Sequence, residues 1–113
     1  MRNDYLKNKV AVVSGSSMGI GKAIAWELAQ LGVKVVLNGR DSERLESAKN
    51  EFFDNGFKVD TFVADIRLQD ECKFLISEVI SIHGQLDILV NNAGVSSRGS
   101  IENSADKNFT ILS

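Results

Sequence analysis

The sequence of 113 residues has few of the side chains on which metal sites and covalent cross-links depend. Cys72 is the one cysteine, which excludes an internal disulfide and a Cys-x-x-Cys redox centre. His83 is the one histidine, so we do not expect a histidine-based metal site or a Ser-His-Asp triad within a single chain. We interpret Cys72 as a core residue and His83 as a charge in the last turn of a helix, where the helix dipole favours it.

Strong charge and long apolar runs are also absent. The formal net charge is −2 at pH 7, which offers nothing to attract nucleic acid or an anionic membrane. No apolar run approaches the roughly 20 residues of a membrane-spanning helix, and the N-terminal MRNDYLKNK lacks the apolar stretch of a secretory signal. With 43% hydrophobic and 25% charged residues, the composition is that of a soluble globular domain, which we expect to be cytoplasmic.

What the sequence contains is a regular alternation of short apolar runs and amphipathic segments. Apolar runs bounded by turn residues predict four strands, at 10–13, 33–37, 57–63 and 86–90. The third run alternates more than the first two, so we expect it nearer an edge of the sheet. Apolar residues at helical spacing predict helices over 20–31, from 41 or 42 to about 56, and over 69–83. A weaker pattern predicts a fourth helix that is capped by Ser104 and carries Ala105, Phe109 and Leu112.

This order of strand and helix, repeated with short connections, predicts an α/β fold. Right-handed crossovers between the strands require a parallel sheet with helices on both faces. A glycine-rich turn follows the first strand, which favours the doubly wound, Rossmann-type strand order 3-2-1-4.

The glycine-rich turn reads SGSSMGIG, and its spacing Gly15-x-x-x-Gly19-x-Gly21 differs from the usual G-x-G-x-x-G. The first turn of the following helix presents unpaired N–H groups and the positive end of its dipole, which suits a phosphate. Gly15 would permit the tight turn, Gly19 would let phosphates approach the backbone, and Gly21 would let the helix pack closely on the sheet. Ser16 and Ser17 would add hydroxyl donors. The alternative is a glycine turn without a ligand.

Three segments together carry a resemblance to a family. SGSSMGIG resembles the TGxxxGIG loop of the short-chain dehydrogenases/reductases, with Ser14 where Thr is commoner. Asp65-Ile66 resembles the family's pair that meets the adenine ring, and the NNAG motif at 91–94 matches the family's segment beside the nicotinamide-side ribose. Because carboxyl ends of parallel strands share one edge, the three segments should converge on one dinucleotide. The residues that we expect to bind this cofactor are Gly15, Ser16, Ser17, Met18, Gly19, Ile20, Gly21, Asn38, Arg40, Asp65, Ile66, Asn91, Ala93 and Gly94.

The end of the second strand favours NADP(H) over NAD(H). An acid there would bind the ribose hydroxyls of NAD, but this position holds Gly39, and Arg40 follows. A guanidinium can bind the 2′-phosphate of NADP through paired hydrogen bonds. Two features weaken the preference: Asp41 is close by, although it is better suited to cap a helix, and Met18 stands where many NADP-using relatives place Arg or Lys. The alternative is that Arg40 is merely solvated.

The resemblance implies hydride transfer between a nicotinamide and a small carbonyl or alcohol substrate. In the family a Tyr acts as acid and base, a Lys four residues later lowers its pKa, and a Ser orients the substrate. Tyr5 and Lys9 have that spacing but precede the first strand, so we do not expect them to be catalytic. We therefore assign no catalytic residue, expect the catalytic group beyond Ser113, and interpret residues 1–113 as the NAD(P)-binding N-terminal portion of a longer single-domain fold that is inactive alone. The alternatives are a non-catalytic dinucleotide-binding or interaction module, and a flavodoxin-like or signalling domain, which would explain neither NNAG nor Asp65.

The predicted strand at 86–90 also has a structural consequence. In the full fold a fifth strand flanks the fourth, so here we expect 86–90 to be an unpaired apolar edge. We accordingly expect self-association, aggregation or marginal stability.

Overall fold

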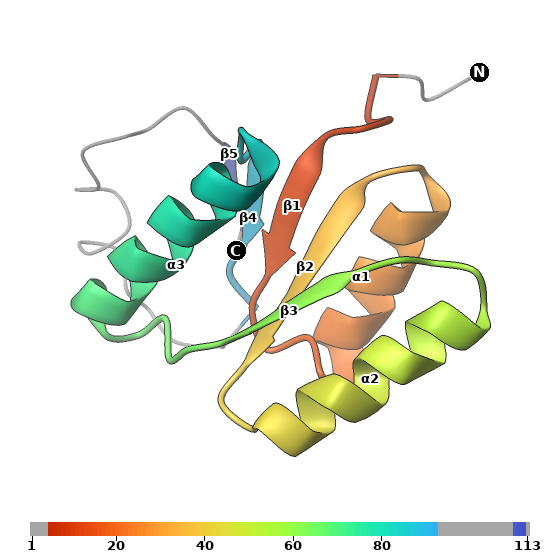
Figure 1. Cartoon of the computed structure of the whole chain (residues 1–113), viewed down its shortest axis with the longest axis horizontal. Coiled ribbons are helices and arrows are strands. Elements are labelled where there is room, and N and C mark those ends of the chain that lie inside the picture. Colours follow the sequence, from red (N-terminus) through yellow and green to blue (C-terminus); the bar gives the residue numbers. More distant parts are fainter. Residues whose placement is uncertain (1–4, 93–109, 113) are drawn as a thin grey trace.

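The structure is a computed structural model that describes residues 5–92 and 110–112. In the described residues, strands and helices follow one another along the chain (Figure 1). The strands are β1 (Val10–Val13), β2 (Lys34–Gly39), β3 (Asp60–Val63), β4 (Ile88–Val90) and β5 (Thr110–Leu112). The helices are α1 (Gly19–Gln30), α2 (Ser42–Asp54) and α3 (Gln69–His83).

All the strand pairs are parallel, and the order across the sheet is β3-β2-β1-β4-β5. At the centre, Val12 of β1 lies opposite Val36 of β2 on one side and Leu89 of β4 on the other. The predicted parallel sheet and the order 3-2-1-4 are therefore confirmed. The prediction that the third strand lies at an edge is confirmed as well.

The alternation of side chains along β1 divides the core into two layers. Val10 and Val12 belong to a buried cluster with apolar residues of α3, whereas Ala11 and Val13 belong to a second cluster with apolar residues of α1 and α2. Figure 1 shows the same arrangement, with α3 on one face of the sheet and α1 and α2 on the other. All four residues of β1 are buried, as the predicted central strand requires.

An aromatic cluster explains why β3 is shorter than predicted. The Phe57 ring lies edge-on to Trp26 of α1 at 5.4 Å and near Phe52 of α2, and its backbone N–H donates to the Phe52 carbonyl at 2.9 Å. Phe57 thus closes the end of α2, and pairing with β2 begins only at Asp60. The other boundaries also shift: β2 runs two residues further, to Gly39, and β4 starts at Ile88.

The fourth helix predicted from the sequence was wrong at its C-terminal end, where Leu112 lies in a strand. Thr110 to Leu112 form strand β5, parallel to β4, because Thr and Ile favour extended backbone and Ile111 packs against the α3-side core. The Leu112 carbonyl accepts from Asn91 N–H at 2.6 Å, and Thr110 N–H donates to Asp87 O at 2.8 Å. The other residues of the predicted helix, 104–109, lie outside the described residues.

Strand β5 also overturns the expected bare edge. Strand β4 is paired on both sides, by β1 and by β5, so it offers no free edge for another chain. The expectation that β4 forms the unpaired edge is therefore wrong, whereas self-association itself stays a prediction. Among the helices in the described part of the chain, none has both the length and the apolar character needed to cross a bilayer.

Candidate functional site

The loops that follow β1, β2, β3 and β4 are tied to one another at the carboxyl edge of the sheet. Asn92, after β4, donates its backbone N–H to the Ser14 hydroxyl at 2.7 Å and its side-chain amide to the Gly15 carbonyl at 3.4 Å. Ser16 and Asn38 are joined through their backbones, and the Asn38 amide reaches Ala64 O, after β3, at 3.2 Å. The three segments of the predicted site therefore converge on one edge.

The glycine loop has the backbone that its spacing predicts. Gly15 and Gly19 have φ values of 60° and 65°, in the left-handed region that favours glycine. A Cβ on Gly21 would lie 2.2 Å from the Gly15 carbonyl oxygen, so only glycine lets α1 approach the β1 turn this closely. A Cβ on Gly19 would meet no described atom within 4 Å. Other atoms therefore pack closely against Gly21, whereas the space beside Gly19 is free of described atoms.

The N-terminal ends of α1 and α2 differ in what satisfies their amides. In α2 the Asp41 carboxylate accepts from the N–H groups of Glu43 and Arg44 at 3.0 and 3.1 Å. In α1 the N-cap residue is Met18, which makes no side-chain capping bond, and the first turn carries no acid. The first amides of a helix have no acceptor within the helix. The uncapped amides and the positive end of the helix dipole therefore make the start of α1 suited to bind an anion.

Two of the residues predicted to bind the cofactor, Ser16 and Asn38, use their side chains to bond neighbouring backbone instead. The Ser16 hydroxyl donates its one proton to Val13 O at 2.6 Å and accepts from Asn38 N–H, and Ser16 is fully buried. The expected hydroxyl donor is thus already used, and only Ser17 remains for that role. The Asn38 side-chain amide donates to the carbonyls of Phe62 and Ala64, so it ties β2 to the end of β3.

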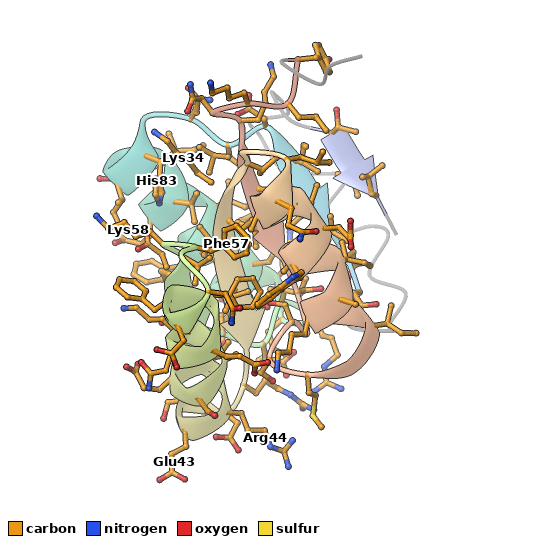
Figure 2. The ribbon with its side chains drawn as sticks, turned by 90° about the vertical axis from the view of Figure 1, so that its right-hand side faces the viewer. Lys34, Glu43, Arg44, Phe57, Lys58 and His83 are labelled. Atoms are coloured by element: carbon orange, nitrogen blue, oxygen red, sulfur yellow. The ribbon has the colours of Figure 1, made fainter. Side chains whose placement is uncertain are left out.

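A pocket of about 270 Å³ opens at this edge. The predicted residues that line it are Gly15, Ser17, Met18, Asn38, Arg40, Asp65 and Ile66. Sequence reasoning missed two arginines of the lining, Arg44 and Arg67. Arg44 is the fourth residue after Arg40, and Figure 2 shows it at the lower end of the molecule, away from Lys34 and His83. Arg67 could have been found as a basic residue shortly after the third predicted strand, and Arg44 as a basic residue in the first turn of the following predicted helix.

Asp65 is the electrostatic centre of the pocket. Its Oδ1 accepts from Arg67 Nε at 2.8 Å and its Oδ2 accepts from Arg67 Nη2 at 2.7 Å, and Arg40 Nη1 lies 3.9 Å from Oδ2. The side-chain hydrogen bonds from Arg67, more than any other interaction, lower the pKa of Asp65 from 3.8 to about 2. The Asp65 backbone N–H is held by the Glu71 carboxylate at 2.7 Å. Asp65 is therefore an anion at any neutral pH.

The remaining predicted residues fall into several groups. Ile20 is exposed at the start of α1, and Asn91 follows β4 with its N–H bonded to β5. Ala93 and Gly94 lie outside the described residues. Asn92, which was not among the predicted residues, connects the described part of the NNAG motif to the glycine loop.

Four residues that were not expected to take part in the site, Tyr5, Lys9, Cys72 and His83, are not among the residues that line the pocket. Tyr5 is 79% exposed before β1, and Lys9 Nζ lies 5.1 Å from the centre of its ring. His83 is the last residue of α3 and contacts Asp60 at 2.7 Å, and Gly84 follows in the left-handed conformation. Cys72 is buried in the core, and burial raises the pKa of its thiol.

A parallel sheet with helices on both faces, a glycine-rich turn after its first strand and a pocket at its carboxyl edge define a Rossmann-type architecture. The family model for the short chain dehydrogenases matches residues 9–112. The chain belongs to the short-chain dehydrogenase/reductase family, as its motifs indicated, and this family consists of oxidoreductases that act on alcohol and carbonyl groups.

Individual relatives agree with this membership. The chain is 40% identical over 102 residues to gluconate 5-dehydrogenase of Gluconobacter oxydans. The aligned residues make up 90% of this chain and 40% of that protein. A metagenomic short-chain oxidoreductase in complex with NADP is 42% identical, with a TM-score of 0.74 over 80% of this chain and 41% of that one. A short-chain dehydrogenase/reductase from Burkholderia phymatum in complex with NAD is 31% identical, with a TM-score of 0.74 over 80% of this chain and 32% of that one.

The chain thus spans about two-fifths of the length of the curated relatives it matches. Of these two solved relatives, one is in complex with NADP and the other with NAD, so both are complexes with a nicotinamide dinucleotide.

Proposed function

We propose that this chain is the cofactor-binding part of an NADP(H)-dependent oxidoreductase of the short-chain type. The observation that carries the proposal is the convergence of the three motif segments on one edge, beside an α1 N-terminus with no capping side chain. Residues 1–113 would act as one dinucleotide-binding unit, with Gly15, Ser17, Met18, Gly19, Ile20 and Gly21 around the pyrophosphate.

The pyrophosphate fits the start of α1. The open space at Gly19 leaves room for phosphate oxygens, and the first amides of α1 point their hydrogen atoms out of the helix. Asn91, Ala93 and Gly94 would lie on the nicotinamide side, as the NNAG motif implies. When bound, the nicotinamide supplies the hydride donor or acceptor, and this chain binds and orients it.

The adenosine end fits the pocket of about 270 Å³. Asp65 would accept a hydrogen bond from the adenine amino group, beside the buried Ile66. Arg40 would bind the 2′-phosphate: its side chain is 68% exposed, and its nearest charged partner among the described residues is Asp65, at 3.9 Å. Asp41, which follows Arg40 in the chain and could otherwise bind ribose hydroxyls, accepts hydrogen bonds from two amides of α2. These contacts support NADP(H) over NAD(H).

The substrate of the whole enzyme would be a small carbonyl or alcohol compound. The described residues place no tyrosine at the pocket, because Tyr5, the one tyrosine of the chain, precedes β1. We therefore expect this chain alone to bind the dinucleotide without turning over substrate.

Isothermal titration calorimetry with NADPH and NADH tests the proposal. NADPH should bind more tightly, and Arg40→Asp should reverse the order, because a charged phosphate contact contributes about 1.5–3 kcal/mol, or roughly 10- to 100-fold in Kd. Lys58→Gln is the matched control, since Lys58 is not among the residues that line the pocket and its loss should leave both affinities unchanged. Equal affinities in the unmodified protein would contradict the cofactor preference, and binding of neither dinucleotide would contradict the proposed function altogether.

A further inference from the structure

Asp65 lies between two guanidinium groups that the site uses differently. Arg67, two residues along the chain, holds both carboxylate oxygens at 2.7 and 2.8 Å. Arg40, from the end of β2, lies 3.9 Å from one of them, beyond hydrogen-bonding distance. Asp65 thus has one firm partner and one charge neighbour.

The contacts of Arg67 nearly fill the acceptor capacity of this carboxylate. Oδ1 accepts from the Arg67 side chain and also from the Arg67 backbone N–H at 3.1 Å, and Oδ2 accepts from the second guanidinium nitrogen. A carboxylate offers about four lone-pair sites. One site on Oδ2 is left, which is enough for an adenine amino group but not for a paired hydrogen bond to Arg40 as well.

The solvent exposure of the three side chains also distinguishes Arg67, which is bonded to Asp65, from Arg40, which is not. The Asp65 side chain is 18% exposed and Arg67 is 40% exposed, whereas Arg40 is 68% exposed. Without Arg67, the Asp65 charge would lie close to Arg40 with no other cation on it. Arg40 would then be drawn into a paired bond with Asp65, and an unneutralised carboxylate would repel a phosphate placed nearby.

We propose that Arg67 is a positioning residue for the NADP preference: by occupying Asp65 it keeps Arg40 free for the 2′-phosphate. This inference rests on the proposed function, because it concerns how the same pocket selects between the two dinucleotides. In this proposal Arg67 does not bind the phosphate itself, because its guanidinium is bonded to Asp65. Its effect passes through Asp65.

A double-mutant cycle on the protein tests this route. The quantity to measure is the ratio of the NADH Kd to the NADPH Kd, by calorimetry, in the unmodified protein, Arg67→Gln, Asp65→Asn and the double variant. Any effect on the adenine end is common to both dinucleotides and cancels in this ratio. Arg67→Gln should lower the ratio about tenfold, a coupling of the size seen between groups in contact. In the Asp65→Asn background the same change should leave the ratio within about twofold, since no charge remains to capture Arg40.

Arg67→Lys supplies the conservative variant. It keeps the positive charge on Asp65 but loses the paired geometry, so it should recover part of the preference. An unchanged ratio in folded Arg67→Gln, or an equal fall in the Asp65→Asn background, would overturn the inference while leaving the proposed function intact. A ratio of one in the unmodified protein would instead overturn the NADP preference and this inference with it.

Discussion

Replacing Gly21 by alanine should force apart the two loops that make the site. An added Cβ would lie 2.2 Å from the Gly15 carbonyl oxygen and 2.5 Å from Asn92 Nδ2, and real Cβ atoms essentially never come within 3.0 Å of another heavy atom. The oxygen belongs to the backbone, so it cannot rotate away as a flexible side chain would. Overpacking of this kind costs about 1–3 kcal/mol, and we expect about 3 kcal/mol here.

Gly19→Ala is the matched control, two residues away in the same loop. Its Cβ would meet no described atom within 4 Å, so the cost is that of placing alanine at φ 65°, about 1 kcal/mol. The same Cβ would project into the open space at the start of α1. We therefore expect NADPH binding to weaken about tenfold or more, as loss of one charged hydrogen bond would produce.

The pair separates packing from ligand binding. Urea unfolding followed by circular dichroism gives the stability of each variant, and calorimetry with NADPH gives the affinity. Gly21→Ala should lose both stability and binding, whereas Gly19→Ala should lose mainly binding. A Gly21→Ala protein as stable as the parent would refute the close approach of α1 to the β1 turn. Full NADPH affinity in Gly19→Ala would refute the placement of the phosphates.

Two further predictions concern charges at the same edge. In an NMR pH titration the pKa of the Asp65 carboxyl should be about 2, and Arg67→Gln should return it toward 3.8. Because the pKa of Asp65 is lower in the folded state than in the unfolded state, ionised Asp65 stabilises the folded protein. This stabilisation is complete above about pH 4 and is lost as the pH falls toward 2. A value near 3.8 in the unmodified protein would show that the Arg67 pairing does not persist in solution. Asp41→Ala should lower the free energy of unfolding by about 1 kcal/mol, because two amides of α2 lose their cap, while Asp54→Ala at the other end of α2 should be neutral or slightly stabilising. Equal effects of these two substitutions in urea unfolding would argue against the capping role.

Much of the fold could be predicted because local signals agree with it. The β-branched run at Val10–Val13 and the helical stripe of α3 each bury one continuous set of side chains, which periodicity records directly. The boundaries were less predictable. Phe57 is apolar and looks like strand, but it packs on Trp26 and Phe52 instead of pairing with β2. Residues 110–112 likewise follow a helical pattern and yet pair with β4, because hydrogen bonds to a distant strand outweigh a weak local preference.

The sequence by itself determined which segments could meet a dinucleotide, because glycines, Asp65 and the NNAG motif follow the strands whose carboxyl ends share an edge. Only the tertiary structure decided which of their groups are free to do so. The Ser16 hydroxyl and the Asn38 amide are used up by neighbouring backbone, and Asp65 is held by Arg67, which periodicity and motif did not single out. Hydrogen-bond capacity is limited and is shared among groups far apart in the chain, so its allocation can be known only when those groups are brought together.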